Sequence, residues 1–64
     1  MEWISFQEQL PPEGVTVHTK IDDEHGFRNE QNLTRRGNFM YMSKGDELFN
    51  MYVYYLPTYW KYIE

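Results

Sequence analysis

The sequence predicts a small β-rich (α+β) domain: a curled antiparallel sheet of four to five short strands with a short helical turn at the N-terminus. Residues 15–21 alternate between apolar and polar side chains, which is the pattern of a half-buried strand. Residues 51–56 are rich in β-forming residues, and short turn signals separate the segments. The 64 residues contain no linker or repeat, so residues 1–64 are expected to form one compact domain.

The helical turn is expected at residues 3–10. Ser5 precedes Glu8 by three residues, as in a capping box. Trp3, Phe6 and Leu10 would lie roughly on one face of such a turn. Two consecutive prolines follow and would end it, because the second holds the first away from helical backbone angles.

The first strand is expected at residues 15–21, where the alternation places His18 and Lys20 on its polar face. Residues 22–26 read DDEHG, a polar and mainly acidic segment that ends in glycine and is typical of a turn. Three successive carboxylates raise the question of a metal, but their spacing does not match a calcium-binding loop. We therefore interpret this run as a solvated turn.

The middle of the chain is less regular. Residues 27–36 are polar and could form an edge strand or an extended loop. Gly37 and Asn38 give a turn signal, which favours a hairpin between residues 32–35 and residues 39–42. A second turn is expected at residues 43–46. The strand at residues 51–56 would be stopped by Pro57, and residues 58–63 could add a short strand at the sheet edge.

Residues 51–63 contain six large aromatic rings. In an extended chain both faces of residues 51–56 are apolar or aromatic, and a small single sheet hides only one of them. The rings could be buried within the chain, covered by a second copy or a partner, or stacked on a nucleotide base. Tyrosine and tryptophan are enriched in protein interfaces, so the expected partner-binding residues are Tyr52, Tyr54, Trp60 and Tyr62.

Four residues form an alternative ligand-binding set. Arginine side chains bind phosphate and carboxylate groups through paired hydrogen bonds, and an aromatic face can stack on a base. The set consists of Arg28, Arg35, Arg36 and Tyr41. The competing interpretation is ordinary solvated surface charge.

Composition argues against several other functions. The net charge of −4 disfavours nucleic-acid binding, and no segment approaches the roughly 20 apolar residues of a membrane span. With no cysteine and only His18 and His25, a structural zinc site lacks ligands. No nucleophile or phosphate-binding motif is present, so we expect no enzyme activity, cofactor or metal. The absence of cysteine and of a signal sequence favours an intracellular location.

Both ends of the chain resemble the DUF551 family of small phage and prophage proteins. Residues 3–17 read WISFQEQLPPEGVTV, and the family begins with Trp-Ile-Ser, a Leu-Pro pair, a glycine and alternating valines. Residues 56–60 read LPTYW and are similar to the family's closing element, with Tyr59 where the family often has histidine. The resemblance implies a phage or prophage origin and a small β-rich fold, and it carries no established activity.

Two hypotheses follow. The first is a phage-encoded accessory protein in the cytoplasm of a bacterial host, which binds and inhibits or redirects a host protein, for example one of antiviral defence. The second is a sponge for a nucleotide signal, with its pocket at a dimer interface. We also expect a homodimer, because a chain this short without disulfides has a thin core.

Overall fold

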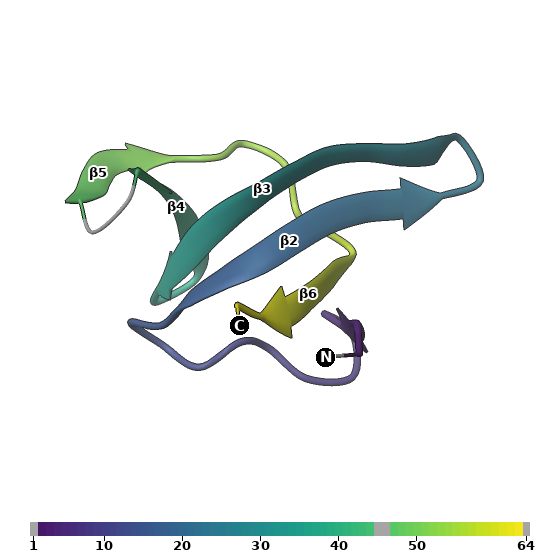
Figure 1. Cartoon of the computed structure of the whole chain (residues 1–64), viewed down its shortest axis with the longest axis horizontal. Helices are drawn as coiled ribbons and strands as arrows, with labels where there is room; N and C mark the ends of the chain where they lie inside the picture. Colours follow the sequence, from purple (N-terminus) through teal and green to yellow (C-terminus); the bar gives the residue numbers. More distant parts are fainter. Residues whose placement is uncertain (1, 45–46, 64) are drawn as a thin grey trace.

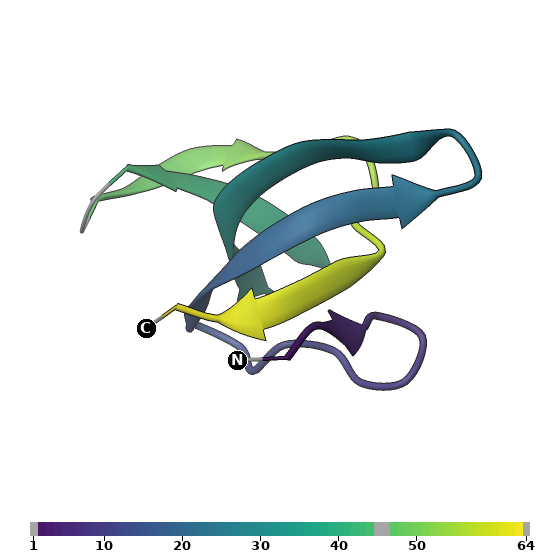
Figure 2. The ribbon, with the colours of Figure 1, turned by 45° about the vertical axis from the view of Figure 1, so that its right-hand side comes forward.

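The computed structural model describes residues 2–44 and 47–63, and it describes side chains outside residues 43–50. Six strands form one antiparallel sheet in the order β1-β6-β2-β3-β4-β5 (Figure 1). They are β1 (Ile4–Ser5), β2 (Thr16–Asp23), β3 (Gly26–Arg36), β4 (Phe39–Lys44), β5 (Glu47–Tyr52) and β6 (Tyr59–Tyr62). The sheet curls without closing (Figure 2). The predicted β-rich antiparallel class is confirmed, with six strands in place of four to five.

The helical turn predicted over residues 3–10 is wrong in extent: the described residues contain no helix, and a single hydrogen-bonded turn lies at residues 5–9. Ile4 and Ser5 instead form β1, which pairs with β6. One hydrogen-bonded turn follows, in which the N–H groups of Glu8 and Gln9 donate to the carbonyl oxygen of Ser5 at 3.1 and 3.0 Å. The turn does not continue because the two prolines that follow Leu10 cannot donate backbone hydrogen bonds.

The predicted alternation of β2 is confirmed, since Val17, Thr19 and Ile21 are buried. The strand runs two residues further than expected, and Asp23 pairs with Gly26 across a two-residue turn. The φ angle of Gly26 is 105°, in the left-handed region that favours glycine. The expected solvated turn is thus the tip of a long hairpin that projects from the sheet (Figure 1).

Residues 27–36, for which the sequence left an edge strand or an extended loop open, belong to β3. This strand lies in the interior of the sheet, between β2 and β4. A bulge interrupts its pairing with β2 near Asn29, whose φ angle is 56°. The predicted hairpin with residues 39–42 forms one residue out of register, so that residues 33–36 are the partners. Gly37 takes the first turn position with φ at 63°, as hairpin turns of this length favour.

The strand predicted at residues 51–56 is confirmed only for residues 51 and 52 and is wrong for the rest. β5 ends at Tyr52, and the chain then crosses from one edge of the sheet to β6, which lies between β1 and β2 and not at the expected edge. The aromatic and apolar pattern of residues 51–56 therefore serves a connection, in which Val53 donates to Met40 and Pro57 is fully buried. The second expected turn includes Gly45 and Asp46, which lie outside the described residues.

The core lies on the inner face of the curl. Its buried members are Phe6, Val17, Leu33, Met40 and Trp60. Trp60 was expected to be exposed for partner binding, and this is wrong: its ring is fully buried and its Nε1 donates to the carbonyl oxygen of Gln9 at 2.8 Å. The ring is buried because β6 lies inside the sheet, opposite Thr19 of β2 and Ile4 of β1.

Candidate functional site

The strand register defines an outer face, opposite the core. Thr34 pairs with both Thr16 and Tyr41, and Tyr41 pairs with Tyr52, so these side chains share one side of the sheet. Val17 and its partners Leu33 and Tyr62 point to the other side. The aromatic residues of the outer face form two groups, one at each end of the sheet.

The first group, called the lysine cluster, surrounds the ammonium of Lys20. Its Nζ lies 4.2 Å from the ring centroid of Trp3, 4.8 Å from that of Phe27 and 5.4 Å from that of Tyr59. Lys61 Nζ lies 4.7 Å from the same Trp3 ring. The Lys20 side chain is 10% exposed. Lys20 is therefore on the predicted face of β2 but is buried there by aromatic rings.

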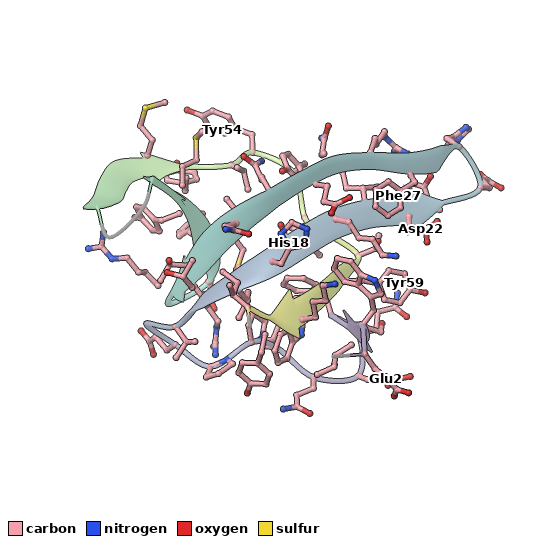
Figure 3. The ribbon with its side chains drawn as sticks, in the orientation of Figure 1. Glu2, His18, Asp22, Phe27, Tyr54 and Tyr59 are labelled. Carbon is pink, nitrogen blue, oxygen red and sulfur yellow. The ribbon has the colours of Figure 1, made fainter. Side chains whose placement is uncertain are left out.

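One carboxylate completes the lysine cluster. Lys20 Nζ donates to Asp22 Oδ2 at 3.3 Å, and Asp22 is nearly half exposed. Figure 3 places Asp22, Phe27 and Tyr59 together, far from Tyr54. Because the rings and the carboxylate surround the ammonium, this cluster has little access for a ligand.

His18 lies next to the lysine cluster and is half-buried, whereas the sequence predicted an exposed histidine. Its Nδ1 lies 2.6 Å from Asn32 Oδ1, its Nε2 lies 2.5 Å from Glu30 Oε1, and its ring packs on Trp3. These partners are an amide, a carboxylate and an indole, and the first two engage both nitrogens of the ring. His25, in contrast, is exposed at the β2–β3 turn, as expected.

The second group, called the tyrosine platform, consists of Phe39, Tyr41, Tyr52 and Tyr54. Ring centroids lie 4.5 Å apart for Phe39 and Tyr52, 5.7 Å for Tyr41 and Tyr52, and 5.4 Å for Tyr52 and Tyr54. Tyr54 is 93% exposed and Phe39 is 49% exposed. The guanidinium carbon of Arg36 lies 4.5 Å from the centroid of the Tyr41 ring. The platform is thus a cluster of rings around Tyr52, three of them exposed and the fourth, Tyr41, half-buried beneath a cation.

Two open grooves adjoin the platform. The larger, of about 400 Å³, lies between the β3–β4 turn and residues 52–56. A smaller groove of about 80 Å³ includes Leu10 and Arg35. Both are lined by Asn38, Met40 and Leu56, and Leu56 is 70% exposed. Platform and grooves therefore form one continuous, largely apolar surface.

The predicted partner-binding residues do not all meet. Tyr52 and Tyr54 lie together on the platform, Trp60 is in the core, and Tyr62 packs edge-on against Trp60 on the inner face at 5.2 Å. The sequence prediction missed Phe39 as a surface ring. Alternation in β4 was the available signal. Phe39 and Met40 are neighbours in the strand, so they point to opposite faces, and Met40 is the buried one.

The alternative ligand set is also divided. Arg28 lies roughly 25 Å along β3 from Arg36, at the spacing of an extended strand. Its guanidinium donates two hydrogen bonds to the carboxylate of Asp23, at 2.9 and 3.1 Å. Arg35 donates to the carbonyl oxygens of Gly37 and Pro11. Only Arg36 and Tyr41 of the four are in contact.

The hairpin tip holds the one strong electrostatic perturbation among the described residues. Hydrogen bonds from the Arg28 side chain and from the His25 backbone lower the pKa of Asp23 from 3.8 to about 2. The same ion pair raises the pKa of Arg28. Both groups are exposed and paired with each other, so this site is a surface ion pair and not a pocket.

Among the described side chains, those of residues 2–42 and 51–63, no three from His, Asp or Glu lie together as they would to hold a metal ion. The same part of the chain has no helix long and apolar enough to cross a membrane. Comparison with known family models, curated proteins and solved structures finds no significant match to this chain. The DUF551 resemblance therefore stays a prediction.

Proposed function

We propose that the protein is a binding module for another protein and that the tyrosine platform is its contact surface. The observation that carries this proposal is the exposure of the platform rings, with Tyr54 at 93%, beside a groove of about 400 Å³. Tyrosine rings supply a large contact area at a low cost in side-chain entropy, and arginine accompanies them in interface hot spots. Continuous apolar surface of this kind is typical of interaction sites.

The partner we propose is a bacterial host protein, which the chain would inhibit or redirect in the host cytoplasm. This part of the proposal rests on the DUF551 resemblance of residues 3–17 and 56–60, because phage accessory proteins commonly act on host proteins. The geometry supports binding in itself: among the described side chains, Tyr54 is 93% exposed and Phe39 is 49% exposed, so these rings can contact a partner.

Two phenylalanines provide a matched test. Phe39 lies on the platform and Phe27 lies in the lysine cluster, on the same face and with nearly equal exposure, 49% and 53%. Tagged wild type, Phe39→Ala and Phe27→Ala would be used to capture proteins from a bacterial lysate, after circular dichroism confirms that all three are folded. We expect a host protein retained by wild type and Phe27→Ala and lost with Phe39→Ala.

The captured protein would then be purified and its affinity measured by calorimetry. We expect Tyr54→Ala and Phe39→Ala to weaken binding about tenfold or more each, which corresponds to about 1.4 kcal/mol. Equal binding by Phe39→Ala, Phe27→Ala and wild type would exclude the platform as the contact surface.

A second candidate function is supported by one contact, the Arg36 guanidinium on the Tyr41 ring. This pair could hold the base and phosphate of a nucleotide signal, and a dimer interface could complete the pocket. A thermal-shift panel of nucleotides tests the proposal, since a ligand that binds the folded state raises the melting temperature. A flat panel would remove this candidate.

Self-association stays a prediction. Five of the described residues make up the buried core cluster, and the platform leaves apolar area uncovered that a second copy could bury. Light scattering at several concentrations measures the mass directly. We expect a dimer, and the mass of a single chain at every concentration would contradict it.

A further inference from the structure

The described side chains at the tyrosine platform and its grooves carry a net positive charge, although the molecule as a whole is acidic. Arg36 is on the platform and Arg35 lines the smaller groove. Among the described residues that line the two grooves, Arg35 is the only charged one. The acidic residues Asp22, Asp23 and Glu24 belong to the opposite end, around the β2–β3 turn.

Among the described side chains, one carboxylate lies beside this surface. Glu13 Oε1 accepts the backbone N–H of Gly37 at 3.1 Å, so this oxygen is already engaged in the β3–β4 turn. Counting Arg35, Arg36 and Glu13, the described charges here sum to about +1, while the whole chain carries −4. These described charges favour an anionic group at this surface, in a molecule of otherwise acidic character.

Arg36 is available to such a group. Its guanidinium stacks on Tyr41, and no hydrogen bond or ion pair to it is found among the described residues. Stacking leaves the edge of the guanidinium, with its N–H donors, directed away from the ring. A planar donor edge of this kind matches a carboxylate through two parallel hydrogen bonds.

We infer that the partner presents an acidic segment to the platform: a large apolar or aromatic side chain enters the 400 Å³ groove, and a neighbouring Asp, Glu or C-terminal carboxylate pairs with Arg36. This inference rests on the proposed protein-binding function and adds the chemistry of the partner. The groove offers apolar contact area and Arg36 offers charge and orientation, which together specify an anchor next to an anion.

A nucleic acid fits these observations less well. Binding to a phosphate backbone relies on several Lys or Arg contacts, and the described part of the platform offers one free guanidinium. The net charge of −4 also repels a long polyanion, whereas it imposes a smaller cost on a segment with one or two carboxylates.

Peptide display tests the inference while the partner is still unidentified. A library of random linear peptides would be selected on the immobilised full chain, and the enriched peptides measured by fluorescence polarisation. We expect enriched peptides to combine Trp, Tyr, Phe or Leu with an adjacent Asp or Glu. Arg36→Glu should weaken the affinity for these peptides about tenfold or more. The affinity of Arg36→Lys should lie between those of wild type and Arg36→Glu, because lysine keeps the charge and lacks the planar donor edge.

Lys61→Glu is the matched control. It reverses the same amount of charge on the same outer face, but in the lysine cluster, so the enriched peptides should bind it within about twofold of wild type. Circular dichroism on each variant separates loss of binding from loss of fold.

Three results would overturn the inference. Enrichment of basic or uncharged peptides, or no enrichment at all, would contradict an acidic segment. Acidic peptides that bind Arg36→Glu as well as wild type would contradict the role of Arg36. Tighter binding of a twelve-residue oligo-dT than of any peptide, lost in Arg36→Glu, would assign the platform to single-stranded nucleic acid.

Tyr54→Ala separates this inference from the proposed function. If the selected peptides lose binding to Tyr54→Ala but not to Arg36→Glu, the platform is a protein-binding surface and only the acidic chemistry is wrong. If neither substitution affects binding, the platform is not the contact surface and both proposals fail.

Discussion

The lysine cluster and the tyrosine platform share the outer face of one sheet and combine the same kinds of group, aromatic rings and a cation. They differ in where the cation lies. In the lysine cluster the Lys20 ammonium is surrounded by Trp3, Phe27 and Tyr59. In the platform the Arg36 guanidinium lies on Tyr41, and the rings beyond it are exposed. An enclosed cation stabilises a fold, while an accessible one can recognise a ligand.

The two groups also differ in what they connect. Trp3 precedes β1, and Lys20, Phe27 and Tyr59 come from β2, β3 and β6. The lysine cluster therefore joins the β2–β3 hairpin to the N-terminal segment and to β6, which are distant from it in sequence. The platform rings come only from β4 and from the chain at and after the end of β5. Loss of a lysine-cluster ring should thus affect folding, and loss of a platform ring should affect binding.

The largest expected effect comes from Trp3→Ala. This ring is half-buried and contacts Lys20, Lys61 and His18, so its removal should lower the free energy of unfolding by about 2 kcal/mol. A fully buried tryptophan costs more, about 3 to 5 kcal/mol. Urea denaturation followed by circular dichroism measures the change.

Tyr54→Ala is the counterpart on the platform. Because its ring is 93% exposed, unfolding free energy should change by less than about 0.5 kcal/mol. Equal losses for Trp3→Ala and Tyr54→Ala would remove the distinction between a structural cluster and a binding surface.

A smaller effect is expected from Lys20→Met, which keeps a long apolar side chain and removes the charge. The ammonium contacts three rings in a largely desolvated place, so we expect a loss of about 1 kcal/mol. Lys61→Met, whose ammonium lies over the same Trp3 ring on a less buried side chain, should cost less than about 0.5 kcal/mol. A stability equal to or above wild type for Lys20→Met would mean that packing alone, without the charge, holds the cluster together.

The smallest effect on stability is expected from the ion pair of Asp23 and Arg28 at the hairpin tip. This pair is exposed, whereas Lys20 is enclosed. The pKa of Asp23 is lowered from 3.8 to about 2, so the pair stabilises the fold above about pH 4 and this contribution is lost as the pH falls toward 2. In Arg28→Ala the pKa of Asp23 should rise toward 3.8, with part of the shift retained because the His25 N–H still donates to Asp23 Oδ1 at 2.9 Å.

A carbon-detected NMR titration of the Asp23 carboxyl group measures this pKa. About 1 M salt should raise it in wild type, because the pair is exposed and screened, and should leave the effect of Lys20→Met unchanged. A salt-independent Asp23 pKa would show that backbone hydrogen bonding, and not the Arg28 charge, lowers it.

Local patterns account for the parts of the fold that were predicted correctly. The alternation around Val17 predicts β2, and the turn at Gly37 predicts the β3–β4 hairpin, because both signals depend on neighbours in sequence. The strand predicted at residues 51–56 ends at residue 52, because β-forming side chains also occur in connections between strands. The helical turn failed because pairing of Ile4 and Ser5 with β6 competes with it.

The candidate site was predicted only in part. Tyr52 and Tyr54 were identified from aromatic density, which also selected Trp60, although Trp60 is in the core. Arg28 and Arg36 were grouped by residue type, although they lie at opposite ends of β3. The density of aromatic residues and the residue type carry no information about which neighbours surround a side chain in the folded chain.

The sequence by itself determined the β-rich class, the alternation of β2 and the existence of an aromatic C-terminal segment, because these depend on the residues and their immediate neighbours. Only the tertiary structure decided that β6 inserts between β1 and β2, so that Trp60 is buried while Tyr54 is exposed. It also decided that Lys20 is enclosed while Arg36 is accessible. The physical reason is that burial depends on contacts between residues far apart in the chain.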